Sequence, residues 1–244
     1  MSVVTIAEAW PAAGRPFTVA ELDQMPDDGR RYELLDGALV VSPRPTTIHQ
    51  YVAMRLLRAL ADACPEDLCV LPEPAVMLSP QTEFDPDLVV VRMDQIGGAK
   101  FTKPPLLVVE IRSPSIALID LNRKKSAYER FGVPSYWILN PEPPQPELTV
   151  FELRDGSYSM MAKASGLFAT GRPFSVSVDL ADLTRGLSRL SARRGGQLVA
   201  GHGEQRDDLR RLVVVPVPPG SAAQLDVQYW ALRPDPGEHP HQPP

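Results

Sequence analysis

Two stretches decide the fold: residues 84–91 read FDPDLVVV, and residues 105–114 read PLLVVEIRSP. Each is an apolar run of strand length that holds or adjoins an acid, Asp87 in the first and Glu110 in the second. A carboxylate buried among Val, Leu and Ile without a partner costs free energy or shifts its pKa. The simplest partner for two such acids is a divalent cation.

Neighbouring strands of a sheet lie about 4.8 Å apart, so two acids on one face can come within reach of a single metal ion. Two unneutralised carboxylates about 4 Å apart repel by roughly 4 kcal/mol at an effective dielectric of about 20. Mg²⁺ or Mn²⁺ converts that repulsion into coordination, because hard cations prefer oxygen ligands. In the alternative interpretation, Asp87 only opens a strand after Pro86 and Glu110 faces solvent.

A predicted helix at residues 116–131 follows the Glu110 strand and carries Lys124 between Arg123 and Lys125. Such a lysine is usually solvated. Its position suggests a further role, because a lysine above a metal-bound water can orient it or stabilise charge on a phosphate.

Three other residues are candidates from their positions. Glu33 lies in a predicted hairpin strand, on the face opposite Tyr32 and Leu34. His49 begins a predicted helix, where a histidine is more often a capping or packing residue than a ligand. Arg112 shares the strand face of Glu110, so it is placed to pair with a carboxylate or hold a phosphate bidentately.

The remaining pattern predicts an α/β or α+β domain with a mixed sheet flanked by helices. Asp36-Gly37 predicts a type I′ hairpin turn, and apolar residues every four positions predict a helix over 46–63. Residues 1–16 are expected to form a flexible lead-in, 17–190 the domain, and 191–244 a mostly flexible, Pro-rich tail. The other predicted elements are a short helix at 18–24, strands at 70–78, 87–92, 105–112, 136–139, 148–153, 158–161 and 174–178, and a helical turn at 179–183.

Composition limits the function classes. The chain has 244 residues, 43% of them apolar, and a formal charge of −5, which argues against a broad basic surface for nucleic acid. Cys64 and Cys69 form neither a disulfide framework nor a zinc pattern. We find no leader and no apolar run near the roughly 18 residues of a membrane span. We therefore expect a protein of the reducing cytoplasm with no membrane contact.

The order of these segments resembles the Uma2 family (DUF820), a group of restriction-endonuclease-like proteins with the PD-(D/E)XK nuclease fold. The resemblance covers about residues 17–185. The segments that carry it are RYELLDG at 31–37, His49, Pro86-Asp87, VEIRSPS at 109–115, Lys124 with Tyr128, and GVPSYW at 132–137.

The resemblance implies metal-dependent hydrolysis of phosphodiester bonds, with Asp87 and Glu110 as metal ligands and Glu33 as a further acid. A strict nuclease motif places its lysine where this chain has Arg112. The Uma2 pattern instead points to Lys124 on the next helix, with Lys125 the less favoured choice. Ser135 departs from the glutamate that the family often carries, and we expect it at the surface.

The leading hypothesis is therefore a Mg²⁺- or Mn²⁺-dependent endonuclease that acts on nucleic acid, DNA before RNA, through Glu33, Asp87, Glu110 and Lys124. Dimerisation is a further expectation, because a second copy would widen the contact surface. The rival hypothesis is a catalytically silent binding or regulatory module with the same fold. A third is a scaffold whose acids are only salt-bridged.

Overall fold

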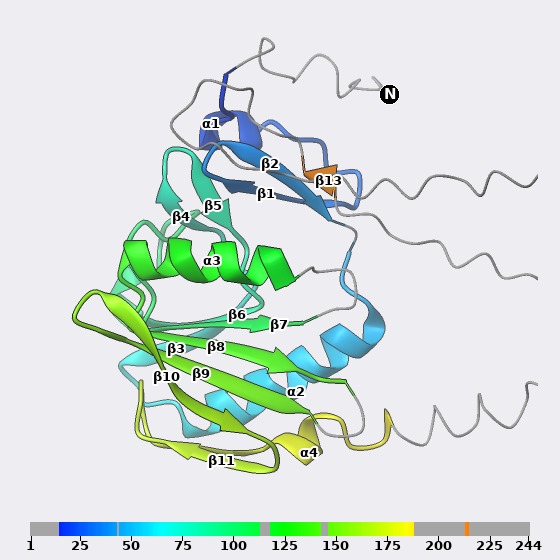
Figure 1. Ribbon diagram of the computed structural model, residues 1–244, viewed down its shortest axis with the longest axis vertical. Helices are drawn as coiled ribbons and strands as arrows, with labels where there is room; N and C mark the ends of the chain where they lie inside the picture. The colour runs from blue at the N-terminus through cyan, green and yellow to red at the C-terminus, as the bar shows by residue number, and fades with distance from the viewer. Residues whose placement is uncertain (1–14, 43, 113–117, 143–145, 188–212, 215–244) are drawn as a thin grey trace, which may run out of the picture.

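The computed structural model describes residues 15–42, 44–112, 118–142, 146–187 and 213–214, with only the backbone of 118–121 and 213–214. The chain forms helices on both faces of a central sheet, with a second sheet beyond one of those helices (Figure 1). The helices are α1 (Val19–Leu22), α2 (Thr47–Ala63), η2 (Met93–Gln95, a 3-10 turn), α3 (Leu118–Phe131) and α4 (Leu180–Leu183). The strands are β1 (Arg31–Leu35), β2 (Ala38–Ser42), β3 (Leu68–Pro72), β4 (Val76–Ser79), β5 (Thr82–Phe84), β6 (Leu88–Arg92), β7 (Leu107–Ile111), β8 (Ser135–Asn140), β9 (Glu147–Arg154), β10 (Ser157–Ala164), β11 (Leu167–Thr170), β12 (Val176–Asp179) and β13 (Val213–Val214).

The central sheet has six strands in the order β10-β9-β8-β7-β6-β3. Its strands β7 and β8 are parallel and its other neighbours antiparallel. A parallel pair needs a crossover, and α3 supplies it between β7 and β8. The sheet is therefore mixed, as the sequence predicts.

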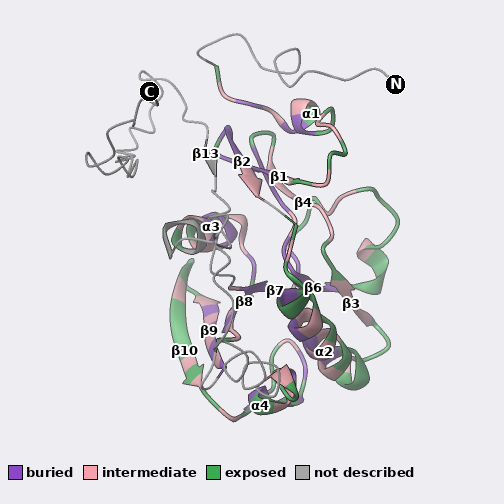
Figure 2. Ribbon diagram, turned by 90° about the vertical axis from the view of Figure 1, so that its right-hand side faces the viewer, coloured by how far each residue is buried: buried purple, intermediate pink, exposed green. Residues whose placement is uncertain are grey.

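Alternation along β7 divides the core into two clusters. Leu107, Val109 and Ile111 pack toward α2, whereas Val108 packs toward α3. Figure 2 colours buried residues purple, and purple segments lie along β6 and β7 and on parts of α2 and α3. Because successive side chains of a strand point to opposite faces, Glu110 lies on the α3 side.

The second sheet has five strands in the order β13-β2-β1-β5-β4 and lies across α3 from the first (Figure 1). The β1–β2 hairpin turns at Asp36 and Gly37, whose φ angles are 47° and 80°. Both values are positive, as the predicted type I′ turn requires. A Cβ on Gly37 would lie 2.4 Å from Pro16 Cβ, so the turn also needs glycine for space.

The predicted strand over residues 70–78 is wrong as a single element. Glu73, with φ of 48°, separates β3 from β4, and these two strands are edges of different sheets. Pro72 and Pro74 flank that break, and proline cannot donate to a ladder, which fits an edge position.

Two further expectations change. Ser135 is buried rather than at the surface, and its hydroxyl accepts a hydrogen bond from Trp137 Nε1 at 3.2 Å. Val213 and Val214 of the tail pair with Val41 and Val40 of β2. Part of the tail thus belongs to the second sheet, although the sequence suggested a domain limit near residue 190.

Three predicted segments lie partly outside the described residues: residues 1–14 of the lead-in at 1–16, the first residues of the helix at 116–131, and most of the tail at 191–244. Among the helices that are described, none is both long and apolar enough to cross a membrane.

Candidate active site

Asp87 and Glu110 lie at the same end of neighbouring strands of the central sheet, Asp87 just before β6 and Glu110 within β7. In the antiparallel pair of β6 and β7, Leu88 lies opposite Val109, so one further step of the register sets Asp87 opposite Glu110. Directly opposed residues have Cβ atoms about 4.5–5.5 Å apart. Both acids are 2% exposed. The two acids thus occupy neighbouring positions at the end of the β6–β7 ladder, and their role as a metal-binding pair stays a prediction.

Glu33 approaches the two strand acids from the second sheet. It shares its strand face with Leu35, which packs in the cluster around α3, whereas Leu34 packs on the other side. This is the face that alternation predicts. The backbone N–H of Asp85 donates to Glu33 Oε1 at 3.0 Å and helps to fix the carboxylate.

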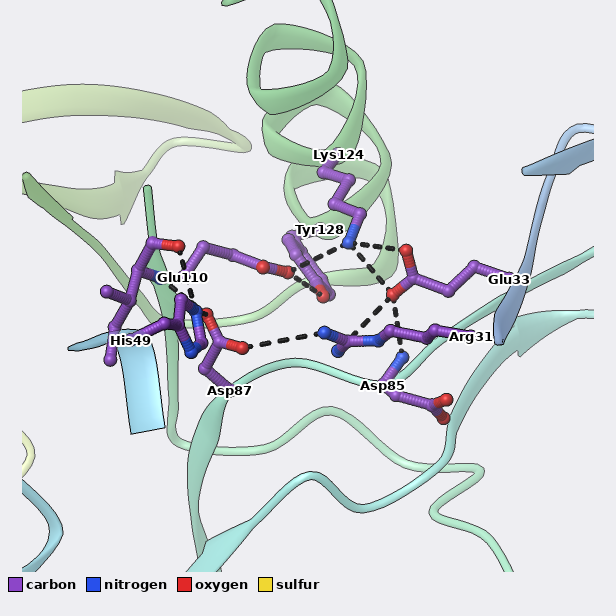
Figure 3. Close-up of polar contacts among 9 residues, drawn as sticks. Arg31, Glu33, His49, Asp85, Asp87, Glu110, Lys124 and Tyr128 are labelled. Carbon is purple, nitrogen blue, oxygen red and sulfur yellow. Dashed lines mark hydrogen bonds and ion pairs between the residues drawn. The ribbon is translucent and has the colours of Figure 1, made fainter. Parts of the chain in front are cut away.

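Lys124 joins the two sheets through its ammonium group. Its Nζ lies 2.8 Å from Glu33 Oε2 and 3.4 Å from Glu110 Oε1 (Figure 3). Tyr128, one helical turn later, donates its hydroxyl to Glu110 Oε1 at 3.0 Å. Residues four apart share one helix face, so α3 presents both groups to the same acid.

Arg31 is a member of this cluster that sequence reasoning did not select. Its Nη1 lies 3.6 Å from Asp87 Oδ1, and its Nη2 lies 3.6 Å from Glu33 Oε1. The available signal was its spacing of two from Glu33, which places both residues on the inward strand face. An arginine on an inward face requires a buried anionic partner.

His49 reaches Asp87 from α2. Its Nε2 lies 3.2 Å from both Asp87 Oδ2 and the carbonyl oxygen of Ile111. Since both neighbours accept, Nε2 carries a proton and donates to them. The Ile111 N–H also donates to Asp87 Oδ2 at 2.6 Å. His49 thus holds one oxygen of a candidate ligand, in addition to the packing role expected for it.

The acids of the cluster differ in their pKa values. Burial raises the pKa of Glu110 to about 7, helped by the charges of Asp87 and Glu33 and opposed by Lys124. Burial likewise raises the pKa of Asp85 to about 6.

Two acids shift the other way. Burial opposes ionisation of Glu33, but Lys124 and Arg31 outweigh it and lower its pKa. Burial is likewise outweighed at Asp87, where His49 and Arg31 lower the pKa. The cluster therefore holds two firm carboxylates, Glu33 and Asp87, and two acids with a raised pKa, Asp85 and Glu110, of which Glu110 binds a proton more readily.

Carboxylate oxygens are suitable ligands for a hard divalent cation. The positions of Lys124 and Arg31 show which of these carboxylates are already paired. Asp87 Oδ1 is buried without a hydrogen-bond partner among the described residues, and Mg²⁺ is commonly bound by one or two carboxylates with several waters. In the described part of the chain, however, no three His, Cys, Asp or Glu side chains are grouped to hold a metal. Lys124 and Arg31 contact Glu33 instead. Asp87 Oδ1 is thus a carboxylate oxygen left without a hydrogen bond among the described residues, whereas Glu33 is held by cations.

Neither of the two remaining basic candidates pairs with the acids among the described contacts. Lys125 Nζ stacks 4.1 Å from the ring centroid of Phe151, so Lys124 rather than Lys125 faces the cluster, as the sequence suggested. Arg112 follows β7 and donates its backbone N–H to Leu139 at 2.8 Å. No ion pair of Arg112 with Glu110 occurs among the described contacts.

A mixed sheet that sets two acids beside a helix lysine defines a restriction-endonuclease-like fold. The profile of the Uma2 family, described as "Putative restriction endonuclease", matches residues 19–186, and the chain belongs to this family. A solved structure from Anabaena variabilis, described as a "putative nuclease belonging to DUF820", is similar with a TM-score of 0.58. At 16% identity it covers 69% of this chain and 97% of its own, and it supports the fold. No curated protein matches the chain.

Proposed function

We propose that this protein is a metal-dependent endonuclease that hydrolyses phosphodiester bonds of nucleic acid, with DNA as the first candidate substrate. The observation that carries the proposal is the convergence of Glu33, Asp87, Glu110 and Lys124 in one buried cluster. These residues come from both sheets and from helix α3. Family membership supports the same reaction class.

Asp87 and Glu110 are the proposed metal ligands. Glu110 lies on β7 and Asp87 directly precedes β6, one step beyond the last paired residues of the two strands. The charge of Asp87 opposes ionisation of Glu110, and this repulsion favours a cation between them. Glu33 is the third predicted ligand, and it also positions Lys124. A divalent ion bound here supplies Lewis-acid polarisation of the phosphate and lowers the pKa of a coordinated water.

Lys124 is the proposed group that acts on the reacting atoms. Its ammonium carries three donors, and the contacts to Glu33 and Glu110 hold it over the acids. A donor fixed in a site that excludes water stabilises charge developing on a phosphate oxygen, or orients the attacking water, more strongly than it would in solution.

The experiment is Mn²⁺ titration calorimetry beside a cleavage assay on DNA and RNA. Asp87→Asn and Glu110→Gln should weaken Mn²⁺ binding and abolish cleavage. Lys124→Ala should retain Mn²⁺ binding and lose cleavage, and Lys125→Ala is the matched control on the same helix. No heat of binding in the wild-type protein, or equal binding in both acid variants, would exclude the metal site.

A catalytically silent module is the second candidate, favoured by the ion pairs through which Lys124 and Arg31 already neutralise the acids. Mn²⁺ binding without cleavage of any DNA or RNA tested would select it. A homodimer in the cytoplasm is the proposed working form, and sedimentation that shows only monomer at micromolar concentration would exclude the dimer.

A further inference from the structure

Arg31 is held among the acids by ion pairs that are too long to be hydrogen bonds. Its nearest contacts to Asp87 and Glu33 are both 3.6 Å. Hydrogen bonds between guanidinium and carboxylate groups are about 2.7–2.9 Å long. The side chain is nevertheless only 15% exposed. The guanidinium is thus nearly buried, and it is attracted to its neighbours without being bonded closely to either.

One atom of Arg31 and one atom of Asp87 lack a hydrogen-bond partner in the described part of the chain, and the ion pairs that join them to neighbouring groups are 3.6 Å long. Arg31 Nη2 and Asp87 Oδ1 are both buried without a hydrogen-bond partner among the described residues. Buried polar groups in native proteins are nearly always satisfied. A donor nitrogen is satisfied by an anionic oxygen, and a carboxylate oxygen by a cation. Arg31 Nη2 is therefore suited to an anionic ligand, and Asp87 Oδ1 is suited to a cation.

We propose that Arg31 binds the phosphate of the substrate and competes with the metal ion for Asp87 and Glu33. The proposal rests on the nuclease function proposed above and deepens it. Without substrate, Arg31 neutralises the two carboxylates. With substrate, a divalent cation takes Asp87, and Arg31 turns its free donors to the non-bridging oxygens of the phosphodiester.

Arginine suits this role better than the neighbouring lysine. Its planar fork offers parallel N–H donors that match two phosphate oxygens, whereas an ammonium is a point charge. Lys124 already binds Glu33 and Glu110 at 2.8 and 3.4 Å. Arg31 is thus the cation of the cluster with a donor left for a ligand. The ligand class is a phosphodiester presented together with a divalent ion.

The test uses full-length protein and measures two affinities that do not depend on turnover. Mn²⁺ binding is measured by calorimetry. Binding of a short mixed-sequence DNA oligonucleotide is measured in Ca²⁺, with gels to confirm that the strand stays uncut. The variants are Arg31→Gln and Arg31→Lys, and the control is Arg30→Gln, whose side chain is 54% exposed and pairs with Asp28.

Arg31→Gln should bind Mn²⁺ at least about threefold more tightly, because a competing positive charge is removed. It should bind the oligonucleotide about tenfold more weakly, because a charged contact to phosphate is lost. Arg31→Lys keeps the charge, so its Mn²⁺ affinity should stay near that of the wild type while its oligonucleotide affinity falls. Arg30→Gln should change neither affinity.

An oligonucleotide affinity of Arg31→Gln within twofold of the wild type would overturn the proposal. Weaker Mn²⁺ binding by Arg31→Gln would overturn it as well, because Arg31 would then only hold the acids in position. If Arg31→Gln fails to fold, as judged by its melting curve, Arg31→Lys carries the oligonucleotide part of the test, and an oligonucleotide affinity within twofold of the wild type would again overturn the proposal. A wild-type protein that binds neither Mn²⁺ nor DNA would instead refute the nuclease function itself.

Discussion

The ammonium of Lys124 lies 2.8 Å from the carboxylate of Glu33. Lys124 belongs to helix α3, which packs on the central sheet, whereas Glu33 belongs to strand β1 of the second sheet. Both side chains are almost fully buried, at 3% and 4% exposed. Burying two charges is costly unless they are paired with good geometry. This contact therefore fixes the second sheet against α3 and sets the position of the lysine above Glu110.

Removal of Lys124 is expected to destabilise the protein strongly at neutral pH. Lys124→Met leaves Glu33 and Glu110 without their ammonium, and loss of one partner of a buried ion pair costs about 3–5 kcal/mol. The matched control is Lys125→Met, which removes only a cation–π contact with Phe151 worth about 1 kcal/mol. Urea unfolding measures both. Equal losses in the two variants would contradict the buried ion pair.

Glu110 should make the protein less stable as the pH rises. Its pKa is 4.5 in the unfolded chain and about 7 in the folded protein. The folded state thus binds a proton that the unfolded state has released between these values, and stability falls as pH rises through that window. Glu110→Gln removes this titration. Relative to the wild type, its stability should increase between pH 5 and 8, by on the order of 3 kcal/mol in all.

Urea unfolding at each pH measures this dependence. Asp87 itself adds none in the window, because its pKa is lowered and its contribution to stability is lost only as the pH falls below its usual pKa of 3.8. Asp87→Asn is nevertheless no flat reference, because it also shifts the pKa of His49. A flat difference between Glu110→Gln and the wild type from pH 5 to 8 would show that Glu110 is ionised throughout.

His49 should reverse the direction of its pKa shift when Asp87 is neutralised. Burial lowers the pKa of the imidazole, but the hydrogen bond and charge of Asp87 outweigh it and raise the pKa above 6.5. In Asp87→Asn the burial remains and the charge is gone, so the pKa should fall below that value. NMR titration measures it. Because the other histidines are His202, His239 and His241, deletion of residues 195–244 leaves His49 as the sole signal.

The tail should contribute modestly to stability through β13. Deletion of residues 195–244 removes the pairing of Val213 and Val214 with β2. A backbone hydrogen bond is worth about 0.5–1.5 kcal/mol net, and about 1 kcal/mol shifts the midpoint of a chain of this size by roughly 2–4 °C. We expect a loss of a few degrees in a thermal melt. Deletion of residues 216–244, which keeps the strand, should cost nothing. Equal midpoints for the two deletions would show that β13 adds no stability.

Much of the candidate site could be predicted from sequence because strand alternation is local. The apolar runs at 84–91 and 105–114 mark two buried strands, and a period of two fixes which face each acid occupies. Glu33 follows from the same rule in the Asp36-Gly37 hairpin. Lys124 required family resemblance as well, because a helix lysine between two basic neighbours has no local feature that distinguishes it.

The amino-acid sequence by itself determined the two buried strands beside Asp87 and around Glu110, the Asp36-Gly37 hairpin and the strand faces of Glu33 and Glu110, because these depend on side-chain periodicity and turn conformation within a few residues. Only the tertiary structure decided that Arg31 and His49 join Asp87, and that β3 and β4 belong to different sheets. Arg31 and Asp87 are 56 residues apart in the chain, so their contact depends on how the two sheets pack across α3. Periodicity fixes the face that a side chain occupies, whereas its partner is fixed by the packing of distant elements.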